Sequence, residues 1–445
     1  MLKDKPGSHI VYGIDERPPL AEAIPLGMQH LVAMFLGNIT PPIVIAGALE
    51  ALSGQTGFLV QMALLWAGVS TVIQAYPIGP IGARIPMVMG TSFAFVGVII
   101  STGTNYSVGA AFGTCLAAAG VEVVLGFAID KVKKFFPPLV TGIVVMLIGL
   151  TLIPVGMDYA AGGVGSADYG SLMNLSIAGI VLLVTVFLNQ LAKGLFSYAS
   201  VLIGVLVGYA IAMMLGQVGF SGVAEAGWFA FPSFLPFGIE FVWPSIFLMM
   251  FVYVISAIET MGDITGTIGA VGRAPTTKEL RGGLVADGVM SGLGAFFGAF
   301  PNTSYSQNVG LVNFTGIASR HVAALGGVFL VLLGLVPKVG AVVATIPSAV
   351  IGGGGLMMFG MIFASGAAII NRNVEMNQRN MIILAVSIAL GLGVQFKPDV
   401  FQHFSQEMKT FFGSGLMMGG LTALILNLIF PQEKAGKEDQ VEPES

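Results

Sequence analysis

The feature that most limits the fold of this chain is its series of long apolar stretches. A membrane-spanning helix needs about 20 mostly apolar residues, and the sequence offers twelve such stretches: 24–47, 56–76, 107–129, 136–156, 174–192, 197–216, 241–263, 283–300, 321–337, 341–366, 380–396 and 410–430. Two shorter stretches, 86–101 and 301–318, each open with a proline and are rich in Gly, Ser, Thr or Asn. We interpret them as interrupted spans. The sequence therefore predicts an all-α polytopic membrane protein with fourteen transmembrane segments.

The composition excludes several other classes of protein. Charged residues make up only 9% of the chain, against about 25% in an average soluble domain, and a net charge of −4 leaves no basic face for nucleic acid. Cys115 is the single cysteine and the four histidines are scattered, so we expect no disulfide, no metal and no cofactor. We see no paired nucleophile and base, hence no enzyme. The N-terminus does not resemble a signal peptide, which makes the first span a retained one.

The lysines and arginines predict how the chain lies in the membrane, because cytoplasmic loops are enriched in positive charge. With the N-terminus inside, 16 of the 19 basic residues fall on the inner side. They are Lys3, Lys5, Arg17, Arg84, Lys131, Lys133, Lys134, Lys193, Arg273, Lys278, Arg281, Arg320, Arg372, Arg379, Lys434 and Lys437. Only Lys338, Lys397 and Lys409 fall outside. Both termini are therefore predicted to be cytoplasmic.

The two halves of the sequence echo each other in order. Three pairs of short motifs recur about 210 to 225 residues apart: Gly37-Asn-Ile-Thr40 with Gly262-Asp-Ile-Thr265, Pro86 with Pro301, and Pro138-Leu-Val-Thr-Gly142 with Pro347-Ser-Ala-Val-Ile-Gly352. This order predicts two seven-span repeats, and an odd number of spans inverts the second copy in the membrane. Inverted repeats and interrupted spans are typical of secondary transporters and favour alternating access over a channel.

Five ionisable side chains fall within the spans or at their edges, and each costs about 2.5–3.5 kcal/mol near the membrane centre, which makes it a functional candidate. They are His30, Glu122, Glu259, Asp263 and Asp287. Glu259 and Asp263 lie four residues apart on one helical face without a cation in their span, so at least one is expected to hold a proton near neutral pH. Asp263 and Asp287 are either functional or structural, in the second case bonded to backbone amides of the interrupted spans. His30 is either a helper or a core histidine, and Glu122 receives no role.

The interrupted spans carry the residues that suit a flat, polar substrate. Gln307 and Asn308 offer amides with a donor beside an acceptor, which matches the edge of a purine or pyrimidine dione. Phe93 and Phe95 are candidates for an aromatic face on which the ring stacks. No arginine is near, which argues against sulfate or phosphate as cargo.

These motifs resemble the nucleobase-ascorbate transporters, also called nucleobase:cation symporter family 2. Residues 307–316, QNVGLVNFTG, match the family signature Gln/Glu-Asn-x-Gly followed after four residues by Thr. Further motifs are similar in type and order to those of bacterial xanthine permeases: Gln29-His30-Leu31, Glu259-x-x-x-Asp263, Gly282-Gly-Leu-x-Ala-Asp287-Gly288, Thr315-Gly-Ile-Ala-Ser-Arg320 and Ile346-Pro-Ser-Ala-Val350. The resemblance covers roughly residues 17–430.

The resemblance implies a uracil-permease-like fold with short strands in the interrupted spans 3 and 10. It divides the chain into an N-terminal tail (1–23), core-domain spans 1–4 (24–130) and 8–11 (238–340), gate-domain spans 5–7 (131–220) and 12–14 (341–430), and an acidic C-terminal tail (431–445). It further implies proton-coupled uptake by an elevator-like movement, in a homodimer within the lipid of the bacterial inner membrane. No cofactor is implied; the proton is the coupling ion.

The resemblance also implies a role for each site residue. Glu259 accepts from base N–H groups, Gln307 pairs with the ring edge, and Phe93 and Ser92 line the pocket. Asp287 and His30 support the site, Asp263 affects coupling or geometry, and Asn308 braces the motif.

Substrate choice rests on position 307, where uracil-type members carry Glu, so Gln307 favours xanthine or uric acid. Val309 and Ser92 both replace an Asn common in xanthine permeases, which leaves the choice between these two purines open. The alternatives are a uracil-type permease of the same family and an anion transporter of the sulfate-permease kind.

Overall fold

The structure is a computed structural model that describes residues 10–129 and 137–431. Part of the predicted inner surface lies outside the described residues, namely Lys3, Lys5, Lys131, Lys133, Lys134, Lys434 and Lys437, together with residues 432–445 of the predicted acidic tail.

The first half of the described chain contains one short strand among its helices. Its elements are α1 (Leu20–Ala48), η1 (Glu50–Leu52), α2 (Thr56–Ala75), β1 (Met89–Thr91), η2 (Phe93–Phe95), α3 (Val96–Asn105), α4 (Val108–Phe127), α6 (Pro138–Ala160), α7 (Leu172–Leu191), α8 (Leu195–Tyr198), α9 (Ser200–Met214) and α10 (Ser221–Glu225).

The second half follows a similar order. Its elements are α11 (Trp243–Ala270), α12 (Thr277–Ala295), β2 (Asn302–Ser304), α13 (Ser306–Thr315), α14 (Arg320–Gly334), α15 (Pro337–Ala344), α16 (Ser348–Asn373), α17 (Gln378–Phe396), η3 (Pro398–Phe401), α18 (Gln406–Phe412) and α19 (Gly415–Ile429).

The prediction of a helical, multi-pass membrane protein is confirmed in its coarse form. Among the described residues, eight helices are long and apolar enough to cross a membrane, or nine if the bent pair α14 and α15 forms one span. The other predicted spans coincide with elements that fall short of this test: α12 carries four charged residues, and α3, α9, α13 and α19 have 10 to 15 residues each. The count of fourteen crossings therefore stays a prediction.

The two interrupted spans contain the strands that the family resemblance implies. β1 and β2 pair antiparallel, with Met89 opposite Ser304 and Thr91 opposite Asn302. Backbone bonds extend the pairing on both sides, from Tyr305 N–H to the Val88 carbonyl at 3.0 Å and from Ser92 N–H to the Pro301 carbonyl at 3.1 Å. Extended backbone at this depth is possible because the two strands satisfy each other's polar groups. Segments more than 200 residues apart are thereby joined inside the helical bundle.

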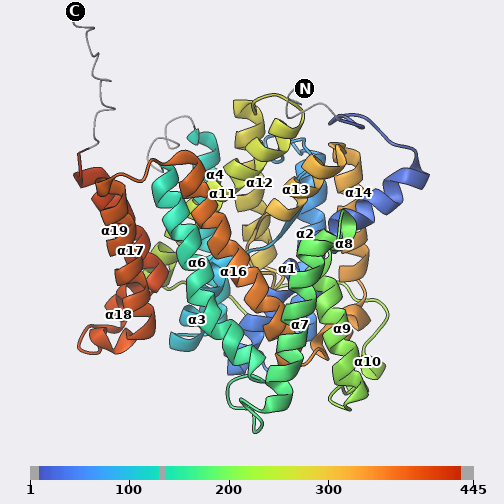
Figure 1. The fold of residues 1–445 in the computed structure, drawn as a ribbon, viewed down its shortest axis with the longest axis horizontal. Coiled ribbons are helices and arrows are strands. Elements are labelled where there is room, and N and C mark those ends of the chain that lie inside the picture. The colour runs from blue at the N-terminus through green and yellow to red at the C-terminus, as the bar shows by residue number, and fades with distance from the viewer. Residues whose placement is uncertain (1–9, 130–136, 432–445) are drawn as a thin grey trace, which may run out of the picture.

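Helices cross closely where both partners are small residues, as is common in membrane bundles. A Cβ atom on Gly352 of α16 would lie 2.1 Å from the backbone nitrogen of Ala160 in α6, and one on Gly68 of α2 would lie 2.4 Å from the Gly327 carbonyl of α14. In Figure 1, α17–α19 stand at one edge of the molecule and α9 and α10 toward the other, with α6, α16 and α7 between them. The described chain begins and ends toward the same end of the bundle.

One predicted boundary is wrong. The span expected at 341–366 is broken by Thr345, Ile346 and Pro347, so that α15 ends at Ala344 and α16 begins at Ser348. Proline disfavours helical backbone in the residue before it and cannot donate to the preceding turn, which explains the break. α15 belongs with α14 instead, from which it bends by 80°.

Candidate functional site

The strand pair is fixed to the surrounding helices by buried polar side chains. Asn38 of α1 accepts from Thr91 N–H at 2.7 Å through Oδ1 and donates from Nδ2 to the Ala63 carbonyl at 3.1 Å. The Tyr305 hydroxyl donates to the Thr91 carbonyl at 2.7 Å, and Thr71 of α2 accepts from Met89 N–H at 2.9 Å. Since most of these groups are buried, each bond also prevents the cost of an unpaired polar atom. The two half-helices α3 and α13 thus start from a rigid platform.

Asp263 connects α11 to the start of α13. Its two carboxylate oxygens accept from the Ser304 hydroxyl at 2.6 Å and from the Ser306 hydroxyl at 2.7 Å. Ser304 ends β2 and Ser306 begins α13, so this carboxylate sets where the signature sequence begins. Asp263 thus acts as a brace between these elements. Its partners are side-chain hydroxyls and not the backbone amides expected under the structural alternative.

Asp287 connects α12 to α2 and α11 in the same way. Its Oδ2 accepts from the Thr260 hydroxyl at 2.5 Å and its Oδ1 from the Gln74 amide at 2.9 Å. Gln74 also donates to the Gly283 carbonyl at 3.1 Å and accepts from Ala83 N–H at 2.9 Å. One glutamine therefore ties α2, α12 and the loop before β1 together.

A chain of hydroxyl groups runs between these two carboxylates. Thr260, bonded to Asp287, lies 3.5 Å from the Ser304 hydroxyl, and Ser304 in turn is bonded to Asp263. A branch leads from Thr260 through Thr303, at 3.3 Å, to Ser256, at 3.2 Å. A hydroxyl has one proton to donate, so while Ser304 and Thr260 each donate to a carboxylate, no proton lies between their oxygens at 3.5 Å. The chain of hydrogen bonds is complete only when one of the two carboxyls is itself protonated.

Glu259 and Gln307 differ from these braced residues. Glu259 lies one turn before Asp263 and is half-buried, while Gln307 follows Ser306 and is exposed. Neither side chain makes a hydrogen bond or an ion pair with any part of the chain that the structure describes. Both therefore keep their full hydrogen-bonding capacity for another molecule.

His30 and Asn308 hold each other. The Asn308 amide lies 3.0 Å from His30 Nδ1 and donates to the His30 carbonyl at 3.0 Å. Both side chains are buried, and the Asn308 oxygen has no partner among the described residues. The pair joins α1 to α13.

The aromatic residues of the first interrupted span divide into one partly exposed and one buried ring. Phe93 is half-buried and meets Phe359 of α16 edge-on, with 5.3 Å between ring centroids. Phe95 is fully buried beside Tyr253, so the expectation that it offers a stacking face is wrong. Ser92 is also buried, and its hydroxyl accepts from Ala94 N–H at 3.2 Å as the cap of η2.

Glu122 of α4 is wholly buried, and neither of its oxygens has a hydrogen-bond partner among the described residues. Ser256 is its neighbour, but that hydroxyl is directed at Thr303. An ionised carboxylate in this position would lack any compensating partner in the described chain.

Sequence reasoning missed the neutral members of the site, namely Gln74, Ser256, Thr260, Thr303 and Ser304. Hydroxyls are common in helices and often bond to their own backbone, so their residue types carry little signal. Gln74 offered the clearest hint, as a polar amide near the end of an apolar helix. Within the described ranges 10–129 and 137–431, no cluster of His, Cys, Asp or Glu could hold a metal ion.

Comparison with known proteins identifies relatives along nearly the whole chain. A sequence model described as "Permease family" matches residues 21–400. A putative purine permease of Clostridium perfringens is 42% identical over 97% of this chain and 95% of its own. The xanthine permease XanP of Escherichia coli is 37% identical over 96% of both chains. The uric acid transporter UacT of Escherichia coli is 37% identical over 91% of this chain and 85% of its own.

Solved structures of low sequence identity share the fold. The transmembrane domain of the cyanobacterial bicarbonate transporter BicA superposes with a TM-score of 0.58 at 14% identity, covering 94% of this chain and 99% of that one. The murine anion transporter Slc26a9 in its inward-facing state gives 0.61 at 11% identity, covering 93% and 69%. These likenesses show the uracil-permease-like fold and carry no information about the substrate.

Proposed function

This chain belongs to the nucleobase-ascorbate transporter family, a family of permeases and not of enzymes, and on that premise we propose that it imports a purine nucleobase, xanthine or uric acid, together with protons. The relatives named above include permeases for both purines. The single observation that carries the proposal is the pair of unpartnered side chains, Glu259 and Gln307. Glu259 lies one turn before Asp263, and Gln307 directly follows Ser306, to which Asp263 is bonded.

The chemistry of these two residues suits a purine dione. A carboxylate accepts from ring N–H groups, and a glutamine amide pairs with a carbonyl beside an N–H. Asp263 bonds to Ser306, directly before Gln307, and lies one turn after Glu259. The brace therefore helps to fix the backbone positions of these two residues relative to one another, and such preorganisation lowers the entropic cost of binding.

The carboxyls supply a physical basis for proton coupling. Glu259, Asp263 and Asp287 lie in this region of the bundle, and no lysine or arginine is bonded to any of them within the described chain. A carboxyl without a cation is stabilised by taking up a proton, and Glu259, which alone is both unpartnered and half-buried, is our candidate for the residue that exchanges it.

The pairing of helices supports two inverted repeats. α2 packs on α14 and α4 on α12, which are equivalent contacts if α1–α4 correspond to α11–α14. The contacts of α7 with α9 and α16 likewise correspond to those of α17 with α19 and α6. We propose fourteen segments on this basis, with core and gate domains divided as the family resemblance implies and with an elevator movement between them.

We further propose a homodimer in the bacterial inner membrane with both termini in the cytoplasm. The support for this orientation is that five of the basic residues assigned to the inner side, Arg84, Arg273, Lys278, Arg281 and Arg320, gather around one cavity, as residues on the same side of a membrane should.

The test is uptake into proteoliposomes. We expect labelled xanthine or urate to accumulate under an inward proton gradient and accumulation to stop when a protonophore is added. A panel of unlabelled xanthine, urate, hypoxanthine, guanine, uracil and sulfate then ranks the substrates. Competition by uracil or sulfate, with none by the purines, would overturn the assignment in favour of one of the two alternatives.

A pair of variants tests the role of Glu259. Glu259→Gln should abolish gradient-driven accumulation, because it removes the exchangeable proton and the acceptor for ring N–H groups. The matched control is Glu225→Gln in α10, an exposed glutamate without a partner in the described chain, which should transport normally. Normal accumulation by Glu259→Gln would remove this residue from the mechanism.

A further inference from the structure

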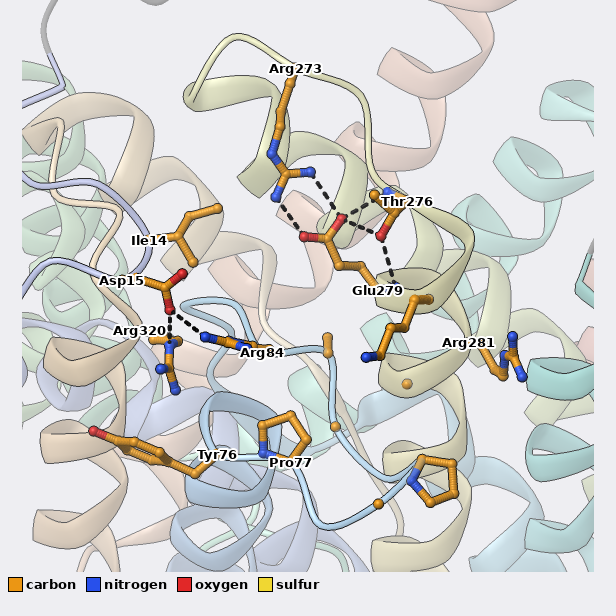
Figure 2. Close-up of a pocket in the computed structure, with 16 residues that line it drawn as sticks. Ile14, Asp15, Tyr76, Pro77, Arg84, Arg273, Thr276, Glu279, Arg281 and Arg320 are labelled. Carbon is orange, nitrogen blue, oxygen red and sulfur yellow. Dashed lines mark hydrogen bonds and ion pairs between the residues drawn. The ribbon is translucent and has the colours of Figure 1, made fainter.

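A cavity of about 820 Å³ lies away from the residues assigned to transport, none of which lines it. Figure 2 shows that it is built from several distant parts of the chain. These are Ile14 and Asp15 of the N-terminal segment, the loop 76–84 after α2, residues 273–282 around the start of α12, and Arg320 at the start of α14. The cavity falls within the size range of small-molecule sites, about 300–1,000 Å³.

The charged side chains around the cavity are unbalanced. Five are basic and two, Asp15 and Glu279, are acidic, which leaves an excess of three positive charges. Both acids are already engaged. Arg273 binds both oxygens of Glu279, at 2.9 and 2.5 Å, and Asp15 accepts from Arg320 at 2.7 Å and from Arg84 at 3.3 Å.

Lys278 and Arg281 are the two cations without an acidic partner among the described residues. The Arg281 guanidinium lies over the ring of Phe127, 5.9 Å from its centroid, and Figure 2 shows it directed away from the other charged side chains of the cavity. The Lys278 ammonium makes no hydrogen bond or ion pair within the described chain. Both retain free N–H donors, which a phosphate group accepts strongly.

We propose that this cavity binds a phosphate-bearing anion of two or more negative charges. Phosphate chemistry is favoured because guanidinium and ammonium groups line the cavity from the loop 76–84, α12 and α14 and because the excess charge exceeds what one carboxylate would balance. The ligand is either a soluble phosphorylated compound or the headgroup of an anionic phospholipid, which share this chemistry. This site is separate from the proposed transport activity and does not depend on it.

The general enrichment of lysine and arginine on the cytoplasmic side of membrane proteins accounts for the presence of basic residues around the cavity but not for their arrangement. The loop that carries Arg84 is held by Gly82 N–H bonding to the Gly282 carbonyl at 2.9 Å and by Arg84 N–H bonding to the Gln74 carbonyl at 2.7 Å. Arg84 itself adopts a φ of 62°, a conformation unfavourable for a residue with a Cβ atom. The surrounding bonds therefore hold Arg84 at the cavity against a local conformational cost.

The same loop leads to the buried carboxylates. Gln74 accepts from Ala83 N–H next to the cavity and donates to Asp287. An anion bound between this loop and α12 would therefore contact the two segments that position Asp287.

The experiment measures binding to the full-length protein in nanodiscs. In phosphatidylcholine discs, inorganic pyrophosphate is titrated and binding is followed calorimetrically; in a second arm, phosphatidylglycerol bound to the protein is quantified by native mass spectrometry. We expect saturable binding in one arm, weakened about tenfold or more in the double variant Lys278→Ala/Arg281→Ala. The substituted residues have no acidic partner, so their removal breaks no ion pair in the described structure.

The matched control is Lys193→Ala/Arg372→Ala, which removes the same charge from the predicted inner side without touching the cavity. It should bind as the unaltered protein does. The proposal is overturned if neither arm shows saturable binding, or if the two double variants lose affinity equally, since the latter would reflect general attraction by the inner face. Purine uptake is a separate measurement, and a change in it neither supports nor overturns the proposed anion site.

Discussion

The buried amide of Gln74 should contribute strongly to stability because it joins three elements at once. Gln74→Leu removes its bonds to Asp287, to the Gly283 carbonyl and from Ala83 N–H. Each neutral bond contributes about 1 kcal/mol, and one to a charged group about 1.5–3 kcal/mol. The loss should therefore be about 4 kcal/mol, with the loop before β1 and the start of α12 both released.

Gln61→Leu is the matched control. Gln61 lies on the same helix and is similarly buried, but its amide nitrogen has no partner in the part of the chain that the structure describes. Both substitutions add the same apolar surface, so comparing them removes that contribution.

The assay is thermal unfolding of the purified protein in one detergent. A loss of about 4 kcal/mol should lower the melting temperature of Gln74→Leu by roughly 6 °C relative to Gln61→Leu, scaled from smaller domains. Melting temperatures within a degree of each other would refute the reasoning, because they would show that the three bonds contribute no net stability.

Three further predictions follow from single contacts. Glu122→Leu should raise stability by about 1–3 kcal/mol in thermal unfolding, because an unpartnered buried carboxyl is removed, and should leave purine uptake intact; lost uptake would instead give Glu122 a part in transport. Tyr198→Phe removes the bond at 3.1 Å to the Gly310 carbonyl, which joins the proposed gate and core domains. A loss of about 1 kcal/mol should change the ratio of the two conformations of the proposed elevator movement roughly fivefold, measured by cysteine accessibility. The hydrogen bond from Arg320 lowers the pKa of Asp15. The ionised Asp15 carboxylate should therefore contribute fully to the stability of the folded protein at pH 7 and at pH 5, and this contribution should be lost only below about pH 4. Asp15→Asn should accordingly melt below the unaltered protein by the same margin at both pH values, and a margin that shrinks by pH 5 would contradict this.

The positions of most spans could be predicted because the signal, a high mean hydropathy, is summed over about 20 residues. Proline marked the interrupted spans at Pro86 and Pro301, and strands follow both. The same logic failed at Pro347, where a long apolar run concealed a break between α15 and α16. Hydropathy averages over a window, whereas one proline changes the backbone at a single residue.

The charged members of the site could also be predicted, since an ionisable group within a span is conspicuous. Their partners could not, because Thr260, Ser304 and Ser306 resemble many other hydroxyl residues. Which hydroxyl meets Asp263 depends on the register of β2 against β1 and on the turn into α13. That information arises only when two segments more than 200 residues apart have come together.

Some polar residues of this region are paired with neighbours and others are unpartnered, and this difference explains how side chains can stay available for a ligand without destabilising the helical bundle. Buried polar groups destabilise a protein when they are unpaired, and here Asp263, Asp287 and His30 are paired with neighbouring side chains. Asp263 holds the end of β2 through Ser304, Asp287 ties α12 to α2 and α11, and His30 joins α1 to α13. Glu259 and Gln307, next to these contacts, remain unpartnered in the described chain. If binding of the substrate or of a proton instead broke the hydrogen bonds of Asp263 or Asp287, each binding event would loosen the contacts that position the site. The proposed coupling through Glu259, which leaves the bonds of Asp263 and Asp287 in place, would avoid this conflict.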